Sequence, residues 1–316
     1  NWEVRPLSIA FRQLDVRQLE KILDRLAAKL APWREEPRLV NLSLFDEYLS
    51  GYQDVLANLE KGTSNRAPDG TVLPSPVEWV LRNREKSWFF DVHEVISHGD
   101  LCIENVLVDM RNEVGLWNFR NTGPGHGLHD FAALEVSALV QLTDMTDQEY
   151  FELALAVTQF SAEREQVLST PRIHFNPLAN KTLDISFKIR SLARAATRYL
   201  DPYEYGWALL LTTVKYIAGR GVTNPSLLRA RLLGGVICQW LEEQYTREGG
   251  ERASSAPLFR SHVQWYSRDE LVKRREEITD YENRLDLFES ERSSYPPDSA
   301  SRRILEEEIT KLKSEL

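Results

Sequence analysis

The chain has 316 residues, of which 42% are hydrophobic and 28% charged, and its formal net charge is −9. This composition is typical of a globular protein with a large core, and the negative charge disfavours nonspecific nucleic-acid binding, which requires Lys and Arg to neutralise phosphates. No run of about 18 apolar residues occurs, so no transmembrane helix is expected. The two cysteines, Cys102 and Cys238, are too few for a disulfide framework. We therefore expect a cytoplasmic protein that binds neither nucleic acid nor membranes.

Helical periodicity dominates the first part of the chain. Residues 15–33 place leucines and isoleucine on one helical face, and Asp15 is a suitable N-cap. A second helix is predicted over residues 42–59. Pro76 is placed to begin a short helix, because proline is favoured at the first helical position. We assign residues 1–40 to a connecting segment with the first helix.

Three short runs in the middle of the chain have the β-branched and aromatic composition of strands. They are "WFFDVHEVI" (88–96), "NVLVDM" (105–110) and "VGLWNF" (114–119). The last two are separated by a turn-forming segment and predict a β-hairpin. From Leu128 onward the pattern is helical, and "TDQE" (146–149) is a capping box that opens one of these helices.

The last seventy residues differ in composition from the rest. Residues 246–266 begin with a polar, Gly- and Ser-rich stretch and predict a linker. Residues 267–316 carry two apolar stripes at heptad-like spacing, separated by "SSYPPDSAS". The stripes are Ile278, Tyr281, Leu285 and Phe288, then Leu305, Ile309, Leu312 and Leu316. We predict an antiparallel helical hairpin that docks on a protein partner or mediates oligomerisation, or that caps the helical body.

One constellation in the predicted strand region has the spacing of a phosphoryl-transfer site. His98, Asp100 and Asn105 form the pattern H-x-D-x-x-x-x-N. Phosphoryl transfer needs a carboxylate to orient the attacking hydroxyl, here Asp100, and oxygen ligands for magnesium, here the Asn105 amide. A second metal-binding carboxylate is expected about a dozen residues later, and that position holds the neutral Asn118.

The segments "HGDLCIENVLVD" and "GLWNFRNTGPGHGLHDFAALE" resemble the kinase-like fold of aminoglycoside and choline phosphotransferases. They are more similar to the bacterial ternary-complex-associated kinase-like domains of conflict systems, in which helical hairpins also occur. The resemblance is tight over residues 90–140 and extends in helical character to about residue 245. It implies an α+β, mostly helical fold: a protein-kinase-like C-lobe over residues 41–245, with a small β-hairpin at the catalytic loop, followed by the helical hairpin.

The resemblance also implies roles for individual residues. Asp100 corresponds to the catalytic base, and His98 to the histidine that holds the catalytic loop. Asn105 corresponds to a metal ligand, and Asn118 stands at the second metal position. The implied cofactors are ATP and Mg²⁺, with Asn105 and Asn118 as the residues that would contact them. Asp130 corresponds to a structural aspartate that binds the backbone of the loop.

Three departures from the family pattern argue against catalysis. Asn118 removes a negative charge from the metal site, and Cys102 stands where a histidine is usual. No segment before Asp100 reads as a Gly-rich phosphate loop followed by a strand lysine and a helix glutamate. The glycines at 123, 125 and 127 follow the metal position and are a weak signal for nucleotide binding.

Two function hypotheses follow. The favoured one is a degenerate, pseudokinase scaffold or sensor in a bacterial defence or signalling complex, without firm need of a cofactor. The alternative is an ATP-dependent phosphotransferase acting on a small hydroxyl compound or a protein, with its nucleotide lobe upstream of Asn1. A pure assembly module is a third option.

Two other patterns have simple structural explanations. His126 and His129 lack the spacing and the general base of a metal hydrolase, so loop and cap positions are favoured. Arg190, Arg194 and Arg198 share a helix face, and a solvated face is favoured over a phosphate-binding patch.

Overall fold

The computed structural model divides the chain into two units, residues 1–257 and 258–316. It describes residues 4–35, 37–59, 65–141, 145–158, 177–197, 200–219 and 224–247. The predicted hairpin (267–316) lies outside these residues, as does the predicted linker (246–266) beyond its first two positions. The described part is α+β and mostly helical, with small antiparallel sheets, as the sequence predicted.

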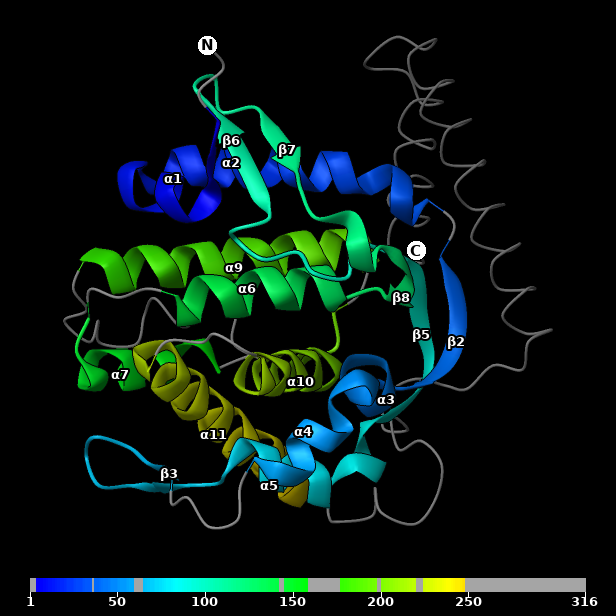
Figure 1. Ribbon diagram of the computed structural model, residues 1–316, viewed down its shortest axis with the longest axis vertical. Coiled ribbons are helices and arrows are strands. Elements are labelled where there is room, and N and C mark those ends of the chain that lie inside the picture. The colour runs from blue at the N-terminus through cyan, green and yellow to red at the C-terminus, as the bar shows by residue number, and fades with distance from the viewer. Residues whose placement is uncertain are drawn as a thin grey trace, which may run out of the picture. The chain divides into compact units, whose positions relative to one another are not determined.

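Four helices of the first unit pack in successive layers (Figure 1). Helix α2 (Val16–Leu30) packs on α9 (Pro177–Thr197), α9 on α6 (His129–Val140), and α6 on α10 (Pro202–Ala218). Helix α10 is buried on nearly all sides, because its central turns are apolar around the whole circumference rather than on one stripe. It forms the centre of the core.

Shorter or more peripheral helices surround these layers. Helix α11 (Asn224–Arg247) packs against α10 and α7 (Asp147–Val157). The remaining α-helices in the described ranges are α1 (Leu7–Gln13), α3 (Leu44–Leu49), α4 (Gln53–Asn58) and α5 (Pro76–Arg82). None of the helices in the described part of the chain is long and apolar enough to span a bilayer.

The strands form three small antiparallel sheets, of which two position the candidate site. The first has the order β1 (Val4–Pro6), β6 (Val106–Asp109), β7 (Val114–Leu116). The second has the order β2 (Arg38–Ser43), β5 (Trp88–Ser97), β8 (Gly123–His126). The third pairs β3 (Asn65–Arg66) with β4 (Val72–Leu73). The loop between β5 and β6 carries the residues of the predicted constellation.

Several local signals in the sequence correspond to the observed element boundaries. Asp15 caps α2 and forms a reciprocal capping box with Gln18. Thr146 and Glu149 form the predicted capping box of α7. Pro76 is the first residue of α5. Strands β6 and β7 form the predicted hairpin.

One prediction about local structure was wrong, and one strand was not predicted. The helix predicted over residues 42–59 is split: β2 extends to Ser43, and the two short helices α3 and α4 are separated by the 3-10 turn Ser50–Tyr52. The glycines of "TGPGH" belong to strand β8, which pairs with β5. Pro124 is tolerated because β8 is an edge strand, where no further strand requires its missing N–H.

A buried ion pair joins three of the core helices. Arg190 of α9 donates from Nε and from a terminal nitrogen to Glu135 of α6, at 3.0 and 2.6 Å. The hydroxyl of Tyr205 in α10 donates to the same carboxylate at 2.6 Å. The expectation that Arg190 lies on a solvated face was therefore wrong, because its partner Glu135 is itself fully buried. A charge in this position requires a buried partner.

Candidate functional site

The loop after β5 is fixed by one buried carboxylate, Asp130, in the first turn of α6. The backbone N–H of His98 donates to Oδ2 of Asp130 at 3.0 Å, and the N–H of Gly99 donates to Oδ1 at 3.1 Å. The side chain of Asp130 has no solvent exposure. Hydrogen bonds from backbone amides to a buried carboxylate are strong and directional, so they fix the course of the loop at the point where it leaves the sheet.

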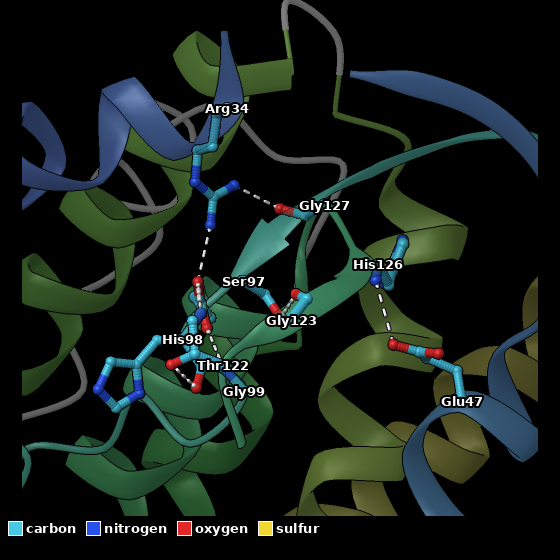
Figure 2. A network of polar contacts seen from close by, with 10 residues as sticks. Arg34, Glu47, Ser97, His98, Gly99, Thr122, Gly123, His126 and Gly127 are labelled. Carbon is cyan, nitrogen blue, oxygen red and sulfur yellow. Dashed lines mark hydrogen bonds and ion pairs between the residues drawn. The ribbon is translucent and has the colours of Figure 1, made fainter. Parts of the chain in front are cut away.

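Arg34 completes the anchor from a distant part of the chain. Its guanidinium donates to Oδ2 of Asp130 at 3.1 Å and to the carbonyl of Gly127 at 2.7 Å; Figure 2 shows Arg34 with its contact to Gly127. Burial lowers the pKa of Arg34, whereas the charge of Asp130 acts in the opposite direction. Sequence reasoning missed this residue, because a single arginine in the 3-10 turn after a helix carries no distinguishing pattern.

Gly99 allows the loop to approach the segment that carries Asn118. Its φ is 75°, and a Cβ at this position would lie 2.2 Å from the carbonyl oxygen of Asn121. Both the positive φ and the close approach exclude a side chain here. The two segments therefore lie against each other only because residue 99 is glycine.

This approach brings together three of the residues that the sequence singled out, Asp100, Asn105 and Asn118. The Asn105 amide donates to the backbone carbonyl of Asp100 at 2.7 Å and to its Oδ2 at 3.1 Å. The Asn118 amide donates to the same Oδ2 at 3.0 Å. An ionised carboxylate can only accept, so both amides present their NH₂ groups to Asp100.

The arrangement does not fit a magnesium ion. Magnesium requires oxygen ligands that converge with near-octahedral geometry. The NH₂ groups of Asn105 and Asn118 both face Asp100, so their amide oxygens do not converge with its carboxylate. Within the described residues there is also no group of three or more His, Cys, Asp or Glu side chains that could hold a metal.

His98 supports the loop and contacts no atom of the Asp100 carboxylate. Its Nε2 lies 2.8 Å from the carbonyl oxygen of Trp117, which can only accept, so Nε2 carries the proton. Its Nδ1 is buried and has no hydrogen-bond partner among the described residues. Because Trp117 directly precedes Asn118, this bond also positions the amide that meets Asp100.

The two histidines of "HGLHD" are occupied by structural contacts. Nδ1 of His126 lies 2.8 Å from the hydroxyl of Tyr48, and its Nε2 lies 2.7 Å from a carboxylate oxygen of Glu204. The backbone N–H of His126 donates to Glu47 at 3.2 Å (Figure 2). His129 packs on the Tyr48 ring, with ring centroids 4.4 Å apart. Both ring nitrogens of His126 are used, so neither is available to a metal.

Cys102 lies in the same loop. Burial raises the pKa of its thiol, and the nearby carboxylates of Asp100 and Glu104 act in the same direction. The thiolate is the nucleophilic form of cysteine, so these surroundings suppress reactivity.

The described residues define an α+β, mostly helical domain whose central loop is held by buried polar contacts. The chain matches the family model described as ternary complex associated domain 9 over residues 25–217, which is more than half of its length. It therefore belongs to this family, which points to a conflict or defence system and, by its description, to protein partners. No curated protein and no solved structure matches the chain.

Proposed function

We propose that this protein is a pseudokinase-like scaffold or sensor in a bacterial defence or signalling complex, where it couples recognition of protein partners to an effector. The observation that carries the proposal is the hydrogen bond from Asn118 to Asp100. An amide occupies the position at which a phosphotransferase of the resembling type needs a metal-binding carboxylate. The buried contacts of Asp130 and Arg34, which fix the course of the loop, support a function that depends on the shape of the loop and not on catalysis.

The fold that we propose for residues 41–245 is a kinase-like C-lobe, with residues 1–40 as the connecting segment and first helix. Residues 246–266 are proposed as a linker and residues 267–316 as a helical hairpin that docks on partners. A cytoplasmic location is part of the same proposal. In this proposal Asp100, His98 and Asn105 occupy the positions of catalytic residues but do not catalyse phosphoryl transfer.

Calorimetric titration of the full chain with ATP, with and without Mg²⁺, tests the proposal together with a phosphorylation assay. We expect no Mg²⁺-dependent nucleotide binding and no turnover. Turnover that disappears in Asp100→Ala would refute the scaffold function.

That outcome would instead support the alternative, an ATP-dependent phosphotransferase acting on a small hydroxyl compound or a protein. The observation in its favour is that Asp100 and Asn105 lie together at the loop. A Gly-rich strand-turn-strand with a downstream Lys and Glu, encoded upstream of Asn1, would point the same way.

A further inference from the structure

A cavity of about 300 Å³ opens beside the loop, on the side of the helices. Its wall combines loop residues with residues along α6, from His129 to Ser137, and with the C-terminal half of α10. Its polar lining includes the side chains of Asp100, His129, Thr212 and Lys215. The volume lies at the lower end of the range for small-molecule sites.

Two side chains of opposite charge, Lys215 and Asp100, line this cavity but do not form an ion pair with each other. Lys215 is half-buried, yet within the described part of the chain no carboxylate lies at ion-pair distance from its ammonium group. Burial lowers the pKa of Lys215, whereas Asp100, Glu47 and Asp130 raise it. A partly desolvated ammonium group without a contact partner is costly, and an anionic ligand would remove that cost.

Asp100 offers a complementary acceptor. The Asn105 and Asn118 amides both bind its Oδ2, and no donor from the described residues binds its Oδ1. A ligand hydroxyl could therefore donate to this second oxygen.

Two further polar side chains line this wall, and one of them, Thr212, lacks a hydrogen-bond partner among the described residues. The Thr212 hydroxyl is buried. His129 is buried, and its pKa is lowered to about 3 by burial, with smaller contributions from Lys215 and His126. Its imidazole is therefore neutral near pH 7. Buried polar groups without partners mark a place where a ligand or water completes the hydrogen bonds.

We propose that the cavity between the Asp100 loop, α6 and α10 binds a small hydroxylated anion. Its anionic oxygen group, a phosphate or a carboxylate, contacts Lys215, and its hydroxyl donates to Asp100. The inference rests on the proposed function in one respect, because it names the class of ligand that the sensor detects. No bond of the ligand is made or broken.

Four probes separate the chemical requirements of the site. Glycerol 3-phosphate and glycerate carry both an anionic group and a hydroxyl, inorganic phosphate lacks the carbon-borne hydroxyls, and glycerol lacks the anion. Each is titrated into the full chain, with binding followed by thermal shift and calorimetry. We expect at least one hydroxylated anion to bind and to raise the melting temperature, and glycerol to do neither.

Variants then test the two contacts. Lys215→Met keeps the length of the side chain and should weaken binding of the anion at least tenfold, because it removes a charge-assisted hydrogen bond. Asp100→Asn should weaken binding of the hydroxylated anion relative to that of inorganic phosphate, because only the hydroxylated anion donates a carbon-borne hydroxyl to this carboxylate. Lys188→Met is the matched control, since this lysine pairs with Asp24 on another helix.

The proposal is overturned if neither hydroxylated anion binds, if glycerol binds as well as they do, or if Lys215→Met binds as tightly as the unchanged protein. If neither hydroxylated anion binds and the ATP assay shows no phosphoryl transfer, the proposed ligand site is refuted and the scaffold function is not. Ligand binding with Asp100-dependent turnover would retain the site and refute the scaffold function.

Discussion

The Asn118 amide donates a hydrogen bond to Asp100, and in the proposed function this amide stands where a phosphotransferase would have a metal-binding carboxylate. Asn118 has a φ of 65°, in the left-handed region that asparagine and aspartate tolerate better than most residues. The backbone at this position is therefore compatible with the aspartate of an active site. An asparagine and an aspartate at position 118 would differ only in the terminal group of the side chain, an amide or a carboxylate.

Asn118→Asp should make the stability of the protein depend on a divalent cation bound between residues 118 and 100. Two carboxylates about 3 Å apart repel each other, and the donor to Asp100 is lost, so we expect a loss of roughly 1–3 kcal/mol in a buffer with EDTA at pH 7. Millimolar Mg²⁺ or Mn²⁺ should restore part of that stability, because a ligand that binds only the folded state stabilises it. Thermal melts with and without the cation measure this.

Asn118→Gly is the control for this variant, because it keeps the positive φ and loses the donor without adding charge. Its melting temperature should not respond to the cation. An equal response of both variants, or none in Asn118→Asp, would contradict our account of the site.

The pH dependence of stability should report on His129. Its pKa is lowered to about 3 in the folded protein, against an ordinary histidine pKa of about 6.5, because the ring is buried. Between these values the unfolded chain takes up a proton that the folded chain does not, so stability falls as the pH falls through this range. Near pH 5 the contribution to the slope is about 1.4 kcal/mol per pH unit.

His129→Gln should remove that contribution. Denaturant unfolding at a series of pH values should show a shallower dependence for the variant between pH 4 and 6, and parallel curves at pH 7.5 and above. Parallel curves over the whole range would show that His129 titrates alike in both states.

At the scale of elements, Asp130 in α6 joins the loop that follows β5 to the 3-10 turn Ala31–Arg34. Asp130→Asn would leave the Arg34 guanidinium buried without a counter-charge. We expect a loss of about 3–5 kcal/mol, because breaking one partner of a buried pair leaves an uncompensated charge. The shift of the denaturant midpoint measures it.

Glu78→Gln serves as the comparison, since Glu78 pairs with Arg82 on an exposed helix face at 2.6 Å. An exposed i,i+4 pair contributes less than about 0.5 kcal/mol. If Asp130→Asn costs no more than Glu78→Gln, the anchor does not stabilise the loop.

Elements were predictable from the sequence where short-range chemistry determines them. The capping residues Asp15 and Thr146, the proline that opens α5, and the hairpin of β6 and β7 all act within a few residues. Strand β8 was missed because Gly and Pro have low strand propensity, and only its pairing with β5 makes it a strand.

In the candidate site, too, residues with a local sequence pattern were predictable, and residues defined by long-range contacts were not. The sequence singled out Asp100, Asn105 and Asn118, and the structure brings them together. Arg34 and Lys215 were not found, because their significance comes from burial and from neighbours that are distant in sequence. A lone charged residue gives no local sign of either.

At the scale of the whole chain, the division into residues 1–257 and 258–316 separates the family domain from the proposed hairpin. A chain ending at Pro257 should therefore melt at the same temperature as the full chain while losing self-association or partner binding. Sedimentation equilibrium of both chains, with a partner pull-down, tests this. Unchanged assembly of the shorter chain would assign the interaction to the first unit.

The anchor of the loop also has a consequence for how the domain is made. Asp130 lies 96 positions after Arg34 and 32 after His98, so the contacts that shape the loop close long stretches of chain. Such contacts form late in folding, after the entropy of loop closure has been overcome. During synthesis, a nascent chain from which Asp130 has not yet emerged from the ribosome cannot hold the loop in this shape. A partner that recognises the loop would thus bind only chains in which this anchor has formed.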